Sequence, residues 1–151
     1  IQSISFTPID PFEYLENFGG SWEVDEDDGE EFYYYDADFR NGDILTVKYS
    51  NKSVSYTYDE DEYSFISSSG EEISREDVYM EPNQYTTHWK LGSNNYFRVV
   101  YYPEGHDTYS YQSDKITVTI KNNPISNIKY IKKTPAVYIY ESETNGEWDY
   151  D

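Results

Sequence analysis

The chain contains no cysteine among its 151 residues, which excludes disulfides, thiolate metal sites and thiol nucleophiles together. Histidine occurs only twice, as His88 and His106, and neither has a partner at the spacing that zinc ligands take on one helix or strand. The sequence also lacks an HExxH or GxSxG motif. We therefore expect a non-enzymatic protein without catalytic residues, metal ligands or a cofactor.

Basic residues are scarce as well. Lysine and arginine number 11 against 30 acidic residues, which gives a formal net charge of −19. Such a charge repels phosphate backbones and anionic lipid headgroups, so nucleic acid is not an expected partner. No apolar run approaches the roughly 20 residues that span a bilayer, and we expect no membrane insertion. Among so many acids some carboxylate pair always has a glycosidase-like separation, so an acid-pair hydrolase is only a third hypothesis.

Aromatic residues are abundant, at 19% of the chain, and 19 of them are tyrosines. Only 36% of residues are hydrophobic, so the core must be built largely from amphipathic rings whose hydroxyls reach polar partners or water. Aromatic side chains favour strands over helices.

Period-two alternation of apolar and polar residues recurs along the chain, with turn-forming clusters between the alternating stretches. Strands are predicted near residues 2–7, 43–49, 53–58, 85–91, 96–102 and 115–121. Residues 50–52 read as the turn of a β-hairpin, and residues 73–80 as either a short helix or an irregular crossing between sheets. The expected fold class is all-β, an antiparallel Ig-like β-sandwich. Trp22 and Trp89 are predicted to be core rings, with His88 facing solvent.

An internal repeat indicates the domain organisation. The pattern Ile-x-x-Ile-x-aromatic at residues 1–6 returns at residues 125–130, and Gly-x-Trp at residues 20–22 returns at residues 146–148. We therefore interpret the chain as a segment of a longer protein. It divides into one Ig-like β-sandwich repeat unit (1–121), a linker (122–124) and the truncated start of a second repeat (125–151).

The repeated segment, together with residues 32–35, 42–47, 55–58 and 116–120, resembles the tandem Ig-like repeat modules of large cell-surface proteins in gut Firmicutes. Such modules have no catalytic residues to carry over. The resemblance implies an extracellular, cell-surface location and a role as spacer or adhesion module. It also implies neighbouring repeats of the same chain as partners, with a protein or glycan ligand that the sequence does not identify.

Two dense acidic runs, at residues 23–31 and 59–62, could in principle offer oxygen ligands to calcium. Counted from Asp25, however, the glycine comes one position too early for an EF-hand, and position twelve is Asp36 instead of glutamate. A solvated loop is the favoured interpretation, and calcium binding is the alternative.

The alternative function is that of a carbohydrate-binding module in a polysaccharide-degrading system, in which exposed tyrosine rings stack on sugars. The candidate binding residues are Tyr33, Tyr34, Tyr35, Tyr101, Tyr102, Tyr109 and Tyr111. The competing interpretation is that tyrosine merely replaces valine and isoleucine on amphipathic strands.

Overall fold

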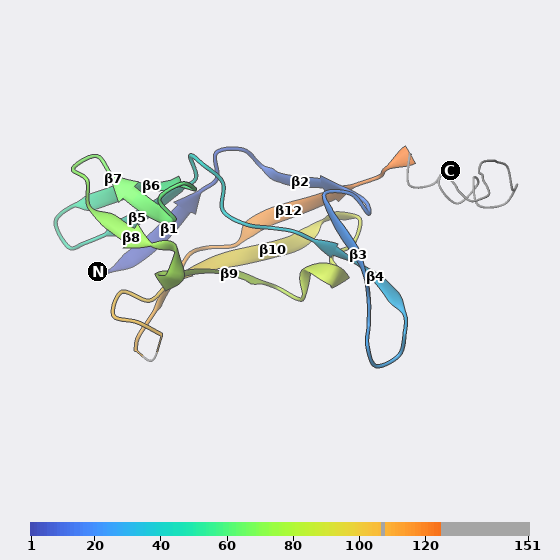
Figure 1. Ribbon diagram of the computed structural model, residues 1–151. Coiled ribbons are helices and arrows are strands. Elements are labelled where there is room, and N and C mark those ends of the chain that lie inside the picture. Colours follow the sequence, from blue (N-terminus) through green and yellow to red (C-terminus); the bar gives the residue numbers. More distant parts are fainter. Residues whose placement is uncertain (107, 125–151) are drawn as a thin grey trace, which may run out of the picture. The chain divides into compact units, whose positions relative to one another are not determined.

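The protein is described by a computed structural model that covers residues 1–106 and 108–124. Ile1–Lys121 form one compact unit. Strands dominate this unit, and its antiparallel sandwich confirms the predicted fold class (Figure 1). In the described part of the chain, no helix has the length and apolar character needed to cross a membrane. The predicted second repeat, residues 125–151, lies outside the described residues.

The first sheet is antiparallel throughout. Its order is β1 (Ser3–Thr7), β5 (Ile44–Lys48), β6 (Ser53–Asp59), β7 (Ser64–Ser67) and β8 (Glu72–Ser74). In β1, Ile4 and Phe6 are buried while their neighbours are exposed, as the alternation of the sequence predicts. The predicted β5–β6 hairpin is confirmed, and Tyr49 N donates to Lys52 O at 2.8 Å within its turn.

The second sheet contains β10 (Gly92–Tyr101) at its centre. Its other strands are β9 (Val78–Pro82), β11 (Tyr111–Gln112), β12 (Ile116–Lys121) and β2 (Phe12–Leu15). β9 lies on one side of β10, whereas β11 and β12 follow each other on the other side. The outer strand β2 runs parallel to β12, with Leu15 opposite Lys121, and is the parallel exception in an otherwise antiparallel sheet.

Strands β3 (Gly20–Val24) and β4 (Glu31–Tyr35) form a separate two-stranded sheet, hereafter the β3–β4 hairpin. Figure 1 shows it near the end of β2 and β12, away from β5–β8. Its inner face carries Trp22, Tyr33 and Tyr35, and β4 lies against the segment at Thr86–His88.

Aromatic rings join the two larger sheets into one core. Phe6 of the first sheet meets Phe97 of the second edge to face, at a centroid distance of 6.2 Å. Phe39, from the segment between β4 and β5, packs on Phe6 at 5.4 Å and on Phe65 at 5.2 Å. Edge-to-face and tilted pairs of this kind stabilise a core beyond the burial of their area.

Two of the few cationic side chains lie on this aromatic core. The Arg40 guanidinium is 3.9 Å from the centre of the Phe12 ring, and the Arg75 guanidinium is 4.6 Å from that of Phe39. Arg75 also pairs with the Asp38 carboxylate at 3.0 Å. The two arginines therefore stabilise the core by packing their guanidinium groups on aromatic rings.

The residues at 73–80 form an irregular crossing between the sheets. The 3-10 turn η1 (Arg75–Asp77) connects β8 of the first sheet to β9 of the second, and the Ser74 side chain accepts a hydrogen bond from Glu76 N. A single 3-10 turn suffices because the chain only has to change sheets.

The strand predicted at residues 85–91 is wrong. This stretch instead contains the 3-10 turn η2 (Thr86–His88). Amide side chains form hydrogen bonds with its backbone. The Asn95 side chain accepts from Lys90 N at 3.1 Å and donates to Lys90 O at 2.8 Å. Local side-chain bonds of this kind replace a ladder between strands.

The two tryptophans in the described part of the chain differ in their environment. Trp89 is 5% exposed and belongs to the core, and its neighbour His88 is exposed, as predicted. Trp22, in contrast, is 41% exposed, so the prediction that it is a core ring is wrong. The reason is that β3 belongs to a two-stranded hairpin, which has no second layer thick enough to enclose the indole.

Candidate functional site

The tyrosines predicted from the sequence as binding residues fall into two separate groups. Tyr33, Tyr34 and Tyr35 lie on β4, which packs beside η2 near the start of β10, whereas Tyr101 lies at the other end of β10, opposite Tyr111. Tyr102 stacks on His106 at a centroid distance of 5.5 Å, and the exposed Tyr109 meets Tyr111 edge to face at 5.9 Å. The seven rings therefore do not form one continuous platform.

Within the β4 group, two tyrosines have structural roles. Tyr33 and Tyr35 are buried, and their hydroxyls accept hydrogen bonds from the backbone nitrogens of Gly20 at 2.5 Å and Asn17 at 3.0 Å. These bonds hold the turn between β2 and β3, where Asn17 has a φ of 56°. Tyr34 points to the opposite face of the hairpin and is 43% exposed.

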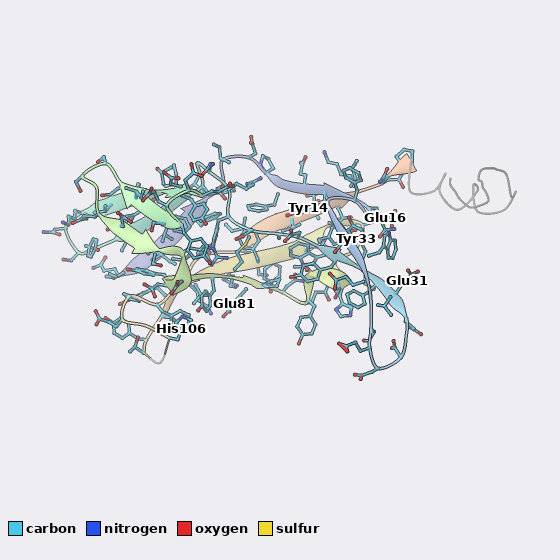
Figure 2. All side chains as sticks on the ribbon, in the orientation of Figure 1. Tyr14, Glu16, Glu31, Tyr33, Glu81 and His106 are labelled. Atoms are coloured by element: carbon cyan, nitrogen blue, oxygen red, sulfur yellow. The ribbon has the colours of Figure 1, made fainter. Side chains whose placement is uncertain are left out.

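A cavity of about 480 Å³ opens beside the inner face of the hairpin. The rings of Trp22, Tyr33, Tyr35 and Trp89 line it, and Glu16 and Lys90 add charged groups; we call it the aromatic hollow. In Figure 2, Glu16 and Tyr33 lie in the same region, near the end of β2. The volume is within the range of roughly 300–1,000 Å³ that is usual for small-ligand sites.

The rings of the aromatic hollow contact one another in sequence from the exposed to the buried end. Trp22 meets Tyr33 edge to face at 5.3 Å, and Tyr33 meets Tyr35 at 4.9 Å. Tyr35 in turn lies 6.4 Å from Trp89, whose indole nitrogen donates to Asn83 Oδ1 at 3.1 Å. Each of the three inner rings is thus fixed both by a neighbouring ring and by a hydrogen bond of its own polar atom.

Burial raises the pKa of the Tyr35 hydroxyl and that of Tyr14, which packs on it at 5.6 Å. Both hydroxyls therefore stay protonated at neutral pH, and neither can serve as a general base there. The arrangement offers flat apolar surface with hydrogen-bonding groups at its edge, which suits binding.

A second cavity, of about 570 Å³, lies between β2, the segment 36–40 and the end of β6. Asp36, Asp38 and Glu60 line it together with Tyr63, which is exposed and has a φ of 54°. The Asp38 carboxylate is already paired with Arg75 at 3.0 Å. We therefore interpret this acidic cavity as part of the framework around Phe39.

The acidic run at residues 23–31 covers the ends of β3 and β4 and the turn between them, at the tip of the β3–β4 hairpin. One oxygen of the Asp25 carboxylate accepts from the backbone nitrogens of Asp27 at 2.7 Å and Asp28 at 3.3 Å, and Asp28 accepts from Glu30 N at 2.9 Å. These carboxylates thus cap their own turn. No group of three His, Cys, Asp or Glu side chains that could hold a metal ion occurs among the residues the structure describes.

The sequence predicted Tyr33 and Tyr35 as binding residues, but it did not indicate the aromatic hollow that they help to form. The signal that could have located it is the pairing of Gly-x-Trp at residues 20–22 with the aromatic run at 32–35 across a single hairpin. No family model, no curated protein and no solved structure matches the chain.

Proposed function

We propose that Ile1–Lys121 is a non-catalytic module of an extracellular bacterial cell-surface protein, which acts as a spacer and as an adhesion unit. The observation that carries the proposal is that the chain enters and leaves this unit at opposite ends. β1 and β2 run one after the other towards the end at which β12 finishes, so Ile1 lies at one end and Lys121 at the other (Figure 1). Units built in this way can follow one another in a line.

The pairing of β2 with the last strand, β12, supports a load-bearing role. β2 is parallel to β12 from Phe12 opposite Val118 to Leu15 opposite Lys121, and Glu16 N donates to Lys121 O at 2.7 Å. Tension applied through the two ends of the unit pulls these strands in opposite directions along their axes. Their hydrogen bonds are then loaded together in shear, and none can break before its neighbours.

The test uses single-molecule pulling. Because the chain has no cysteine, handles can be attached at two introduced thiols, Gln2→Cys and Asn122→Cys, in the full 151-residue protein. We expect one cooperative rupture of the unit at high force in this geometry, because the β1–β5 and β2–β12 pairs are both loaded in shear.

The matched control moves one handle. With handles at Gln2→Cys and Asn51→Cys, the force acts across the open end of the β1–β5 pair, where Ser3 lies opposite Lys48. That geometry opens the bonds one at a time, and we expect a rupture force several-fold lower. Equal rupture forces in the two geometries would contradict the spacer proposal.

A further inference from the structure

Trp22 differs from the other rings of the aromatic hollow in its exposure. Its side chain is 41% exposed, although an indole is large and apolar and is usually mostly buried. Its neighbour Tyr33 supports it edge to face at 5.3 Å and 81°. A large exposed ring that is supported in this way marks a candidate binding surface.

The backbone below Trp22 is held in one arrangement. A Cβ atom on Gly20 would lie 1.8 Å from the carbonyl oxygen of Tyr34, so only glycine allows the two strands to approach this closely. The Gly20 nitrogen also donates to the Tyr33 hydroxyl. Because the rings are already ordered, a ligand that stacks on Trp22 loses little affinity to ordering of the site.

The groups around the rings fit a sugar. One face of a hexose ring presents C–H groups, which pack on an aromatic surface, and its hydroxyls need hydrogen-bond donors and acceptors at the edge. Glu16, Thr87 and Lys90, which carry a carboxylate, a hydroxyl and an ammonium group, also line this cavity. We propose that the aromatic hollow binds a hexose unit of a neutral polysaccharide, with Trp22 as the stacking surface.

The net charge of the protein favours neutral polysaccharides over anionic ones. A formal net charge of −19 repels glycans that carry carboxylate or sulfate groups. Neutral glycans suffer no such repulsion, and the Glu16 carboxylate accepts hydrogen bonds from their hydroxyls. The inference rests on the proposed role as an adhesion unit and names the chemistry of its ligand.

The experiment is a calorimetric titration of the full chain with cellohexaose, xylohexaose, mannohexaose and maltohexaose, and with polygalacturonate and heparin as anionic probes. We expect saturable binding of at least one neutral oligosaccharide and none of the anionic ones. Trp22→Ala should weaken that binding by about tenfold or more, the usual order for loss of one aromatic stacking partner. Trp22→Phe, which keeps a ring, should retain part of the affinity.

Two further variants locate the site. Tyr85→Ala removes a ring that is 76% exposed and lies outside the hollow, and Tyr34→Ala removes one on the opposite face of the hairpin. Both should bind within about twofold of the unchanged protein, while melting curves verify that every variant is folded.

Three results would overturn the inference: no binding of any neutral probe, equal losses in Tyr34→Ala and Trp22→Ala, or tighter binding of an anionic probe. None of them affects the pulling experiment, so a failed ligand assignment is distinguishable from a failed spacer proposal.

Discussion

The carboxylate of Asp43 accepts a hydrogen bond from the backbone nitrogen of Ile9 at 2.8 Å, across 34 residues of sequence. Asp43 is 0% exposed, and its second oxygen accepts from Arg40 N, also at 2.8 Å. Ile9 lies where the chain passes from β1 in the first sheet to β2 in the second. This one buried side chain therefore ties the crossover between the sheets to the turn that precedes β5.

Removal of the Asp43 carboxylate should destabilise the fold. Asp43→Ala leaves the nitrogens of Ile9 and Arg40 without their acceptor and the Arg40 guanidinium without its nearby charge. We expect the free energy of unfolding to fall by about 2–5 kcal/mol, measured by denaturant titration. The exposed Asp61→Ala is the control and should change it by about 0.5 kcal/mol or less. A similar value for both variants would show that Asp43 does not hold the crossover.

Trp22 and Trp89 should respond differently to truncation. Trp89→Ala empties a buried site and should lower the free energy of unfolding by about 3–5 kcal/mol. Trp22→Ala removes a ring that is already 41% exposed and should lower it by about 1 kcal/mol or less. Both values come from denaturant titrations, and the reverse order would mean that the hairpin is a major part of the stable core.

Calcium should not be needed for stability. The Asp25 and Asp28 carboxylates already accept hydrogen bonds from the backbone of their own turn, so the hairpin tip is ordered without an ion. We expect the melting temperature to be the same in EDTA and in millimolar calcium. A melting temperature that rises with calcium concentration would reveal a bound ion, because a ligand of the folded state stabilises it by mass action.

Alkaline pH should destabilise the fold through its buried tyrosines. Burial raises the pKa of Tyr56 from its ordinary value of 10.0 to about 12, and the Tyr49 hydroxyl beside it contributes to this shift. Burial also raises the pKa of four other tyrosines: Tyr14, Tyr35, Tyr58 and Tyr101.

Between pH 10.0, the ordinary pKa of tyrosine, and about pH 12, the pKa of Tyr56 in the folded protein, the folded chain retains a proton that the unfolded chain has released. The stabilisation is therefore complete below about pH 10 and is lost as the pH rises towards about 12. Denaturant titrations across this window, with tyrosinate absorbance recorded in parallel, should show the fall. Tyr56→Phe should make the fall shallower, and a free energy of unfolding that stays constant to pH 12 would contradict the prediction.

The sequence predicted most reliably those strands whose alternation reflects one buried face. Residues 43–49 and 53–58 correspond closely to β5 and β6, because Leu45, Val47 and Tyr56 are buried in strict alternation with more exposed neighbours. The alternation at residues 85–91 was misleading. There, Trp89 is buried from an irregular segment whose backbone is satisfied by Asn95, and periodicity alone does not distinguish such a segment from a strand.

The candidate site was less predictable because it depends on contacts between distant segments. The sequence shows three consecutive tyrosines, but only the pairing of β3 with β4 places Tyr33 beside Trp22 and sends Tyr34 to the other face. Likewise, Trp89, which directly follows the 3-10 turn η2, reaches the same cavity from more than fifty residues later in the sequence. Sequence patterns indicate which residues of a segment are buried, but they do not indicate which distant loops are in contact.

The separate hydrogen bonding of the β3–β4 hairpin has a consequence for how such a protein can evolve. Among the described residues, the hairpin shares no ladder with either larger sheet. It is held instead by Tyr35, whose hydroxyl accepts from Asn17 N in the turn after β2 and whose ring lies 6.4 Å from that of Trp89. Substitution at an exposed position of the hairpin, such as Trp22, therefore leaves the register of the sandwich strands unchanged. Selection can alter what the hairpin recognises while the frame that carries it is inherited intact.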